Sequence, residues 1–131
     1  MSYIINSIAV LFGGAAGAVS RFIMNGAITV AIPSVFPYGI LIINVLGGLI
    51  MGILQGCIAR SGTPHTVLYS LLGTGFLGGF TTFSHFSLNS FDLYTAGHLE
   101  LAAVNVIANT VCCIVAAGIG YSLTGSRVAR A

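Results

Sequence analysis

Residues 73–87 read GTGFLGGFTTFSHFS and decide the fold, because they place helix-interrupting residues inside a long uncharged segment. Gly78 and Gly79 are poor residues for a helix interior, and the hydroxyls of Thr81 and Thr82 can bond back to the helix and bend it. A break at membrane depth is tolerated only inside protein or beside a water-filled cavity, and the carbonyl groups that it frees commonly bind small cations. We therefore expect a membrane helix that is broken near its middle.

Charged residues are almost absent from this chain, which has 131 residues and 5% Asp, Glu, Lys and Arg together. An average soluble domain has about 25% charged residues, and the mean hydropathy here is +1.04. A soluble enzyme, a nucleic-acid binder and a disordered chain are excluded, since the first needs a wet surface and the others need charge. Most of the surface must face lipid.

Four windows contain no charged residue at all: 1–20, 22–59, 61–91 and 101–126. A membrane-spanning helix needs about 20 mainly apolar residues, and each window is long enough to supply one. The sequence therefore predicts an all-α membrane protein, a single domain over residues 1–131 with four transmembrane helices, the third of them broken. These helices are expected at Tyr3–Met24, Tyr38–Arg60, Val67–Tyr94 and Leu99–Leu123.

The arginines give only weak information about orientation. With four spans both termini share one side, which receives Arg60, Arg127 and Arg130, whereas Arg21 lies near the end of the first predicted helix on the other side. A three-to-one count favours termini in the cytoplasm, but so small a bias leaves insertion in both orientations open.

Small and polar residues follow a stripe along the second predicted helix. Gly48, Gly52 and Gly56 are spaced by four, and the same stripe continues to Asn44. Glycines at this spacing allow close packing of helix backbones, so a packing seam is the simplest interpretation of the glycines. Asn44 is different, because an amide at membrane depth must form hydrogen bonds.

The last predicted helix carries a second stripe, formed by Asn105, Asn109, Cys113, Ala117 and Tyr121. The two asparagines either tie helices together or line a pore, and the stripe alone favours neither. Taken with the asparagine of the second helix, they favour a polar pathway through the membrane.

Two phenylalanines follow the predicted break. Phe83 and Phe86 are three residues apart, and Ser84 and Ser87 stand beside them. Spacing alone predicts lipid contact or core packing for the two rings, because both are ordinary positions for aromatic residues in a membrane helix.

Three motifs together resemble those of the Fluc (CrcB-like) fluoride channels. Residues 78–87, GGFTTFSHFS, are similar to the pattern GG-x-[ST]-TFS-x-FS of that family's third helix. Residues 13–21, GGAAGAVSR, are similar to its glycine-rich first helix, which ends in Arg. Residues 39–48, GILIINVLGG, are similar to the G-T-x-x-x-N-x-x-G of its second helix, with Ile40 in place of the frequent Thr. The resemblance covers nearly the whole chain.

The resemblance implies a passive channel that exports fluoride from the cytoplasm of a bacterium. The subunits would form an antiparallel, dual-topology homodimer in the plasma (inner) membrane, with two pores along the dimer interface. The fluoride pathway would contain Asn44, Phe83, Ser84, Phe86, Ser87, Asn105 and Asn109. Arg21 would lie near an aqueous vestibule, and the backbone carbonyls of Gly78 and Thr81 would hold a structural sodium ion (Na+). Members of this family often have Tyr and Ser at the positions of Asn105 and Asn109.

The main alternative is a small four-helix exporter that is driven by protons. Proton coupling needs a titratable group in the membrane, usually a carboxylate, and the only acidic residues, Asp92 and Glu100, lie near the third loop. His85 is the remaining candidate, and a lone histidine in a helix is more often a packing residue. An intramembrane enzyme is disfavoured, because the adjacent Ser84 and His85 point about 100° apart on a helix. The sequence therefore predicts a channel and no enzyme.

Overall fold

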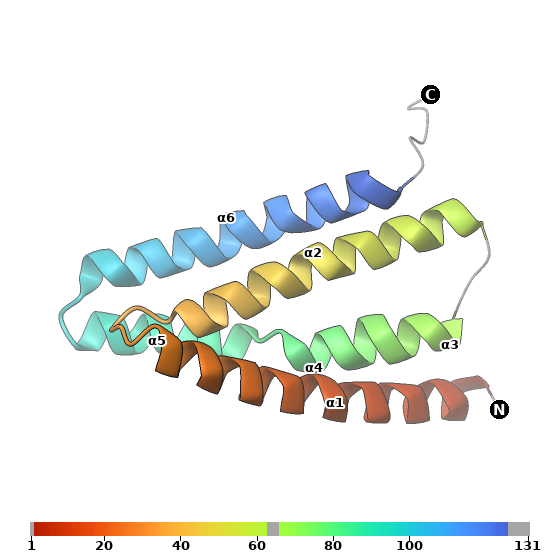
Figure 1. Cartoon of the computed structure of the whole chain (residues 1–131), viewed down its shortest axis with the longest axis horizontal. Coiled ribbons are helices and arrows are strands. Elements are labelled where there is room, and N and C mark those ends of the chain that lie inside the picture. The colour runs from red at the N-terminus through yellow and green to blue at the C-terminus, as the bar shows by residue number, and fades with distance from the viewer. Residues whose placement is uncertain (1, 63–65, 126–131) are drawn as a thin grey trace.

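The computed structural model of the chain describes residues 2–62 and 66–125. Within these ranges all regular structure is helical, as predicted, and there is no strand. The helices are α1 (Ser2–Ala31), α2 (Tyr38–Ser61), α3 (Thr66–Tyr69), the π-helix η1 (Ser70–Leu77), α4 (Gly78–Phe80), α5 (Phe83–Thr95) and α6 (Leu99–Thr124) (Figure 1).

Three of the predicted spans are single helices that are long and apolar enough to cross a membrane: α1, α2 and α6. Helix α1 extends to Ala31, beyond the predicted end at Met24. The helix continues because no proline, which would interrupt its hydrogen bonds, occurs before Pro33. The expectation that Arg21 lies near the helix end is therefore wrong, since nearly three turns of α1 follow it.

The predicted span Val67–Tyr94 is formed by α3, η1, α4 and α5 and is broken near its middle. Thr81 and Thr82 have extended backbones, with φ/ψ of −80°/161° and −155°/119°. The predicted break is confirmed, but it does not lie at the glycine pair: Gly78 and Gly79 are still helical, in α4, and the break follows at Thr81 and Thr82. Gly79 serves packing instead, because a Cβ atom there would collide with the carbonyl oxygen of Gly14 in α1.

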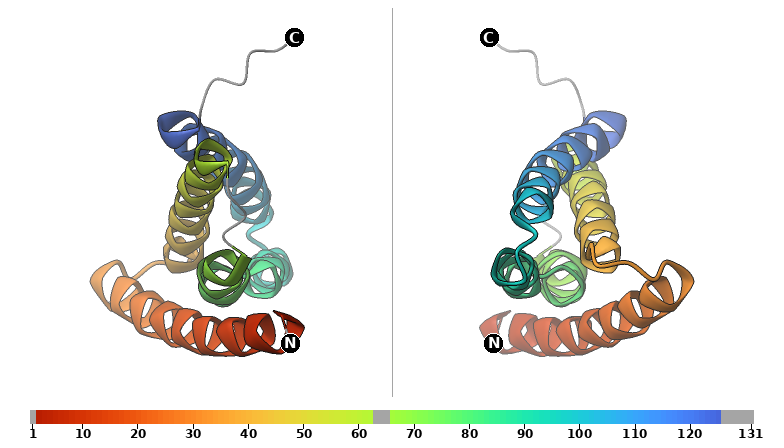
Figure 2. Two further views of the ribbon diagram at one scale, coloured as in Figure 1. Left: turned by 90° about the vertical axis from the view of Figure 1, so that its right-hand side faces the viewer. Right: turned by 90° about the vertical axis from the view of Figure 1, so that its left-hand side faces the viewer.

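The broken segment lies between α1 and the pair formed by α2 and α6 (Figure 1). Figure 2 shows this arrangement along the helices: α1 curves past one side of the broken segment, and α2 and α6 lie on the other. Helix α1 packs mainly against η1 and α4, whereas α5 packs against α6. The break is therefore within reach of side chains from α1 and α2.

The glycine stripe of α2 is confirmed as a packing seam. Its members Gly48, Gly52 and Gly56 lie against the α6 backbone at Cys113, Ala117 and Tyr121, which are residues of the second predicted stripe. A Cβ atom on Gly52 would overlap the carbonyl oxygen of Ala117. Small residues permit this close approach of two membrane helices, and α2 and α6 form the most extensive helix pair of the described chain.

Gly52→Ala should destabilise the protein, because the added methyl group has no space against α6 and the two helices must move apart. We expect the thermal unfolding midpoint in detergent to fall by on the order of 5 °C. Gly118→Ala is the matched control, since, apart from the adjoining backbone of its own helix, no atom of the described chain lies within 4 Å of the position that its Cβ would take. Equal thermal unfolding midpoints for the two variants would contradict the interpretation of the glycine stripe as a packing seam.

Candidate functional site

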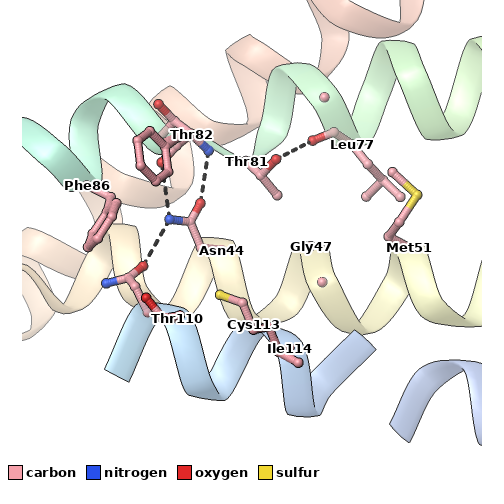
Figure 3. Close-up of a pocket in the computed structure, with 14 residues that line it drawn as sticks. Asn44, Gly47, Met51, Leu77, Thr81, Thr82, Phe86, Thr110, Cys113 and Ile114 are labelled. Atoms are coloured by element: carbon pink, nitrogen blue, oxygen red, sulfur yellow. Dashed lines mark hydrogen bonds between the residues drawn. The ribbon is translucent and has the colours of Figure 1, made fainter. Parts of the chain in front are cut away.

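The side chain of Asn44 in α2 pairs with the backbone at the break. The Thr82 N–H donates to Asn44 Oδ1 at 2.9 Å, and Asn44 Nδ2 donates to the Thr82 carbonyl at 3.2 Å (Figure 3). A further bond begins the next helix, because the His85 N–H donates to Thr82 Oγ1 at 3.3 Å and makes Thr82 the N-cap of α5. The extended residue is thus held on both its backbone groups and on its side chain.

These bonds release two carbonyl groups from helical pairing. In an unbroken helix the N–H groups of Thr82 and His85 would donate to Gly78 O and Thr81 O, four residues earlier. Both N–H groups donate elsewhere, to Asn44 Oδ1 and Thr82 Oγ1. The released carbonyls lie at the C-terminal end of the continuous α3–η1–α4 segment, where the helix dipole favours a cation.

Phe83 and Phe86 lie on the first turn of α5 and differ in burial. Their ring centroids are 5.2 Å apart, and the rings meet edge to face. Phe86 is 8% exposed, whereas Phe83 is 78% exposed. The described chain therefore buries one ring and presents the other at its surface.

Both rings line an open pocket of about 450 Å³ beside the break (Figure 3). The lining consists of Asn44, Gly47, Gly48, Met51, Leu77, Gly78, Thr81, Thr82, Phe83, Phe86, Asn109, Thr110, Cys113 and Ile114. The pocket thus unites four predicted pathway residues, Asn44, Phe83, Phe86 and Asn109, with the two predicted sodium ligands. It does not include Arg21, Ser84, Ser87 or Asn105.

Ser84 and Ser87 lie on the exposed side of α5, next to Phe83. Ser84 Oγ is 3.1 Å from Thr82 Oγ1, and Ser87 Oγ donates to the Phe83 carbonyl at 2.9 Å. Phe83 and Ser87 are four residues apart and so share a helix face. The two hydroxyls and the exposed ring therefore form one continuous surface at the start of α5.

Asn105 and Asn109 are buried, with 1% and 5% of their surface exposed. Asn109 Oδ1 accepts from Asn44 Nδ2 at 3.0 Å, and Asn109 Nδ2 donates to Asn105 Oδ1 at 2.9 Å. Asn105 Nδ2 donates in turn to Ser90 Oγ at 2.9 Å. The two amides tie α2, α5 and α6 together, and their place in a fluoride pathway stays a prediction.

Arg21 reaches from α1 to both sides of the break. Its Nε donates to the Gly79 carbonyl at 3.1 Å, and its Nη1 lies 3.2 Å from His85 Nδ1. Because a guanidinium group only donates, His85 Nδ1 is the acceptor in this contact. Arg21 thus connects α1 with the two pieces of the broken helix, while its predicted vestibule role stays a prediction.

Thr82 and Ser90 belong to the site, although the sequence motifs predicted no site role for either. Ser90 Oγ donates to the Phe86 carbonyl at 2.9 Å and accepts from Asn105. The sequence shows only that Ser90 follows Phe86 by one helical turn. Its interhelical partner is 15 residues away on another helix, so no local pattern reveals this contact.

Comparison with known proteins adds a family match over most of the chain. Residues 8–121 match the family described as CrcB-like protein, Camphor Resistance (CrcB). This range contains all of the residues that the sequence predicts for the pathway and the sodium site, and the pocket beside the break.

Several curated relatives carry the name fluoride-specific ion channel FluC. One from Pseudoalteromonas translucida (strain TAC 125) is 40% identical over 114 residues, which cover 87% of this chain and 95% of the relative. One from Coxiella burnetii (strain CbuK_Q154) is 40% identical over 116 residues, with 88% and 94% covered. A third, FluC 3 of Brucella suis biovar 1 (strain 1330), is 37% identical over 117 residues, with 88% of each covered. From the family match and these relatives, the chain belongs to the CrcB-like protein family.

Proposed function

We propose that this protein is a fluoride-selective, passive ion channel through which fluoride leaves the cytoplasm. Support comes from relatives 40% identical over most of the chain, which are named fluoride-specific ion channels and are therefore not enzymes. In the structure, the observation that carries the proposal is the pocket in which two phenylalanine rings lie beside a broken helix and a buried amide.

The pocket offers fluoride uncharged groups in place of water. Fluoride is small and holds its water tightly, so a pore must replace that water with other positive dipoles. Aromatic ring edges are electropositive, and amide and hydroxyl groups donate hydrogen bonds. The N-terminus of α5, at Phe83, adds a helix dipole that favours an anion. Since none of these groups carries full charge, fluoride is bound weakly enough to leave.

The proposed pathway passes the surface formed by Phe83, Ser84 and Ser87 and continues to Phe86 and the amides of Asn44, Asn105 and Asn109, with Arg21 at the vestibule. Asn44 Nδ2 already donates to Thr82 O and to Asn109 Oδ1. An amide nitrogen has two hydrogens, so a fluoride ion at Asn44 would replace one of these two bonds.

The carbonyls of Gly78 and Thr81 fit the structural sodium ion that the sequence resemblance implies. Both are released from their helical donors at the end of a helix dipole that favours a cation, and carbonyl oxygens are ligands that small cations accept at broken membrane helices. Gly78 is exposed, which suits a site shared between two subunits. A bound ion would supply positive charge that stabilises the C-terminal end of the α3–η1–α4 segment.

The proposed architecture has four membrane spans in one multi-pass domain of the bacterial inner membrane. Helix α5 has 13 residues, fewer than the about 20 that a span needs. The fourth span is therefore the whole broken segment from α3 to α5, which crosses the membrane only as a unit beside α1, α2 and α6.

Two copies in antiparallel orientation would form the two pores along their interface. In the single chain the pocket is open and Phe83 is 78% exposed. A second copy covering this face would complete the pore wall and would bring the Gly78 and Thr81 carbonyls of both copies together.

Dual topology predicts that a membrane-impermeant thiol reagent labels Ser61→Cys from either side of the membrane. Ser61 is exposed at the end of α2, whereas Thr63, in the same predicted connection between the second and third spans, lies outside the described residues. The variant requires a background without Cys57, Cys112 and Cys113. Roughly half of the molecules should react in right-side-out vesicles, and the oppositely inserted half should react in inverted vesicles, because the arginines favour one orientation only weakly. Labelling from one side only would contradict dual topology.

Efflux from liposomes tests the function itself. Purified protein in vesicles loaded with fluoride should release it rapidly without a proton gradient, and vesicles loaded with chloride should release chloride much more slowly. Retention of fluoride under a steep outward gradient would overturn the proposal. Release that requires an imposed proton gradient would support the exporter instead.

A further inference from the structure

A continuous row of hydrogen bonds leaves the helix break, crosses α2 and α6, and returns to α5. It begins at the Thr82 N–H, which donates to Asn44, and ends at the Phe86 carbonyl, which accepts from Ser90 at 2.9 Å. Between them Asn44 donates to Asn109, Asn109 to Asn105, and Asn105 to Ser90, at 2.9–3.0 Å. We call Asn44, Asn109, Asn105 and Ser90 the amide chain.

The direction of every bond in the amide chain is fixed by its two ends. The Thr82 N–H can only donate, so Asn44 must turn its Oδ1 toward it. The Phe86 carbonyl can only accept, so the single proton of Ser90 is committed to it. The Ser90 oxygen must then accept from Asn105, and each amide between the two ends points the same way.

The inner amides have no alternative partner in water, because Asn105 and Asn109 are almost fully buried. Without the Ser90 hydroxyl, Asn105 Nδ2 loses its acceptor. Turning the Asn105 amide over would set its Nδ2 against Nδ2 of Asn109, so that two donors face each other. Either arrangement leaves a buried polar group unsatisfied.

We propose that Ser90 is a positioning residue for fluoride conduction, an inference that rests on the channel function proposed above. As the last member of the amide chain, Ser90 fixes the orientation of its bonds and links the turn that carries Phe86 to the extended residue Thr82. The Phe86 ring and the released carbonyls are thereby held in one arrangement before an ion arrives, so that no binding free energy is spent on ordering them.

Three variants test the role of the hydroxyl in fluoride efflux from liposomes. Ser90→Ala should slow efflux by about tenfold, the size expected for one unsatisfied buried group, while the protein still elutes as a single species. Ser90→Thr keeps the hydroxyl and should restore most of the rate, and Ser90→Cys, whose thiol is a weak donor, should fall between. Thr95→Ala is the control, because Thr95 is on the same helix and its hydroxyl bonds only to α5 carbonyls; it should conduct as wild type.

A double variant separates action through the amide chain from a purely local effect. Asn109 forms no hydrogen bond with Ser90, yet both residues belong to the amide chain. The effects of Ser90→Ala and Asn109→Ala on the efflux rate should therefore be non-additive. The double variant should be no slower than the slower single variant. The role of Ser90 would be overturned if the double variant slowed efflux by the product of the two single reductions. It would also be overturned if Ser90→Ala conducted at the wild-type rate, or if Ser90→Ala and Ser90→Thr slowed efflux equally. If wild-type protein itself retained fluoride, the channel function would fail together with it.

Discussion

Phe83→Ile and Phe86→Ile should each reduce fluoride efflux from liposomes by about a hundredfold or more, the equivalent of roughly 3 kcal/mol lost at the ion. Isoleucine removes the electropositive ring edge and offers fluoride only aliphatic hydrogens. Both rings line the same pocket and meet edge to face with centroids 5.2 Å apart, so loss of either one alters the surface that replaces water.

The two substitutions differ in what else they change. Phe86 is 8% exposed, and its replacement also removes packing against neighbouring helices. Phe83 is 78% exposed, so Phe83→Ile should leave the thermal midpoint of the monomeric fold almost unchanged and is the cleaner test. Phe22→Ile is the matched control, because Phe22 is 81% exposed on α1 and is not part of the pocket lining.

Wild-type efflux in both pocket variants, measured on protein that elutes as wild type does, would remove the ring-edge mechanism. Equal loss in the Phe22→Ile control would point to a general effect of exposed aromatic residues on membrane insertion instead. The prediction therefore requires both a slow Phe83→Ile and a normal Phe22→Ile.

The helices were predictable from sequence because charge and apolar length are local properties. The windows between Arg21, Arg60 and Asp92 gave α2 and the broken segment to within a few residues. The end of α1 was not predictable from charge, because Arg21, three residues before the predicted end at Met24, bonds inside the fold, to Gly79 O and His85. The π-helix η1 has no sequence signal of comparable strength; within it, Gly73 lies against the ring of Tyr69, and Gly75 lies against the α1 backbone at Val10 and Gly13.

The candidate site was predictable where its residues are consecutive and was missed where they are distant. Phe83, Phe86 and the break belong to one motif, and the structure brings them into one pocket. The pairing of Asn44 with Thr82 joins residues 38 apart, and the bond from Asn105 to Ser90 joins two different helices. Such contacts follow from the packing of α2 and α6 around the break, which no single segment of sequence encodes.

Asn44→Asp should abolish fluoride conduction, with efflux reduced by at least about a hundredfold, for two reasons that act together. The carboxylate places a negative charge beside the proposed path of an anion, and repulsion at this depth is strong because little water screens it. The substitution also removes both N–H donors of Asn44, so that one carboxylate oxygen takes the place of Nδ2 and faces the Thr82 carbonyl oxygen and Asn109 Oδ1. The break would then keep the bond from the Thr82 N–H but lose the bond to the Thr82 carbonyl.

Two further variants separate charge from pairing. Asn44→Leu removes the same two N–H donors, and also the acceptor of the Thr82 N–H, without adding charge, so it should lower the thermal midpoint at least as much but leave more residual efflux. Gln55→Glu makes the same amide-to-acid change on α2, at an exposed position outside the pocket, and should conduct as wild type. If Asn44→Asp conducted at the wild-type rate, Asn44 would lie outside the pathway. If it conducted no less than Asn44→Leu, the role of Asn44 would be limited to holding Thr82, and fluoride would be coordinated by the rings and the hydroxyls of α5 alone.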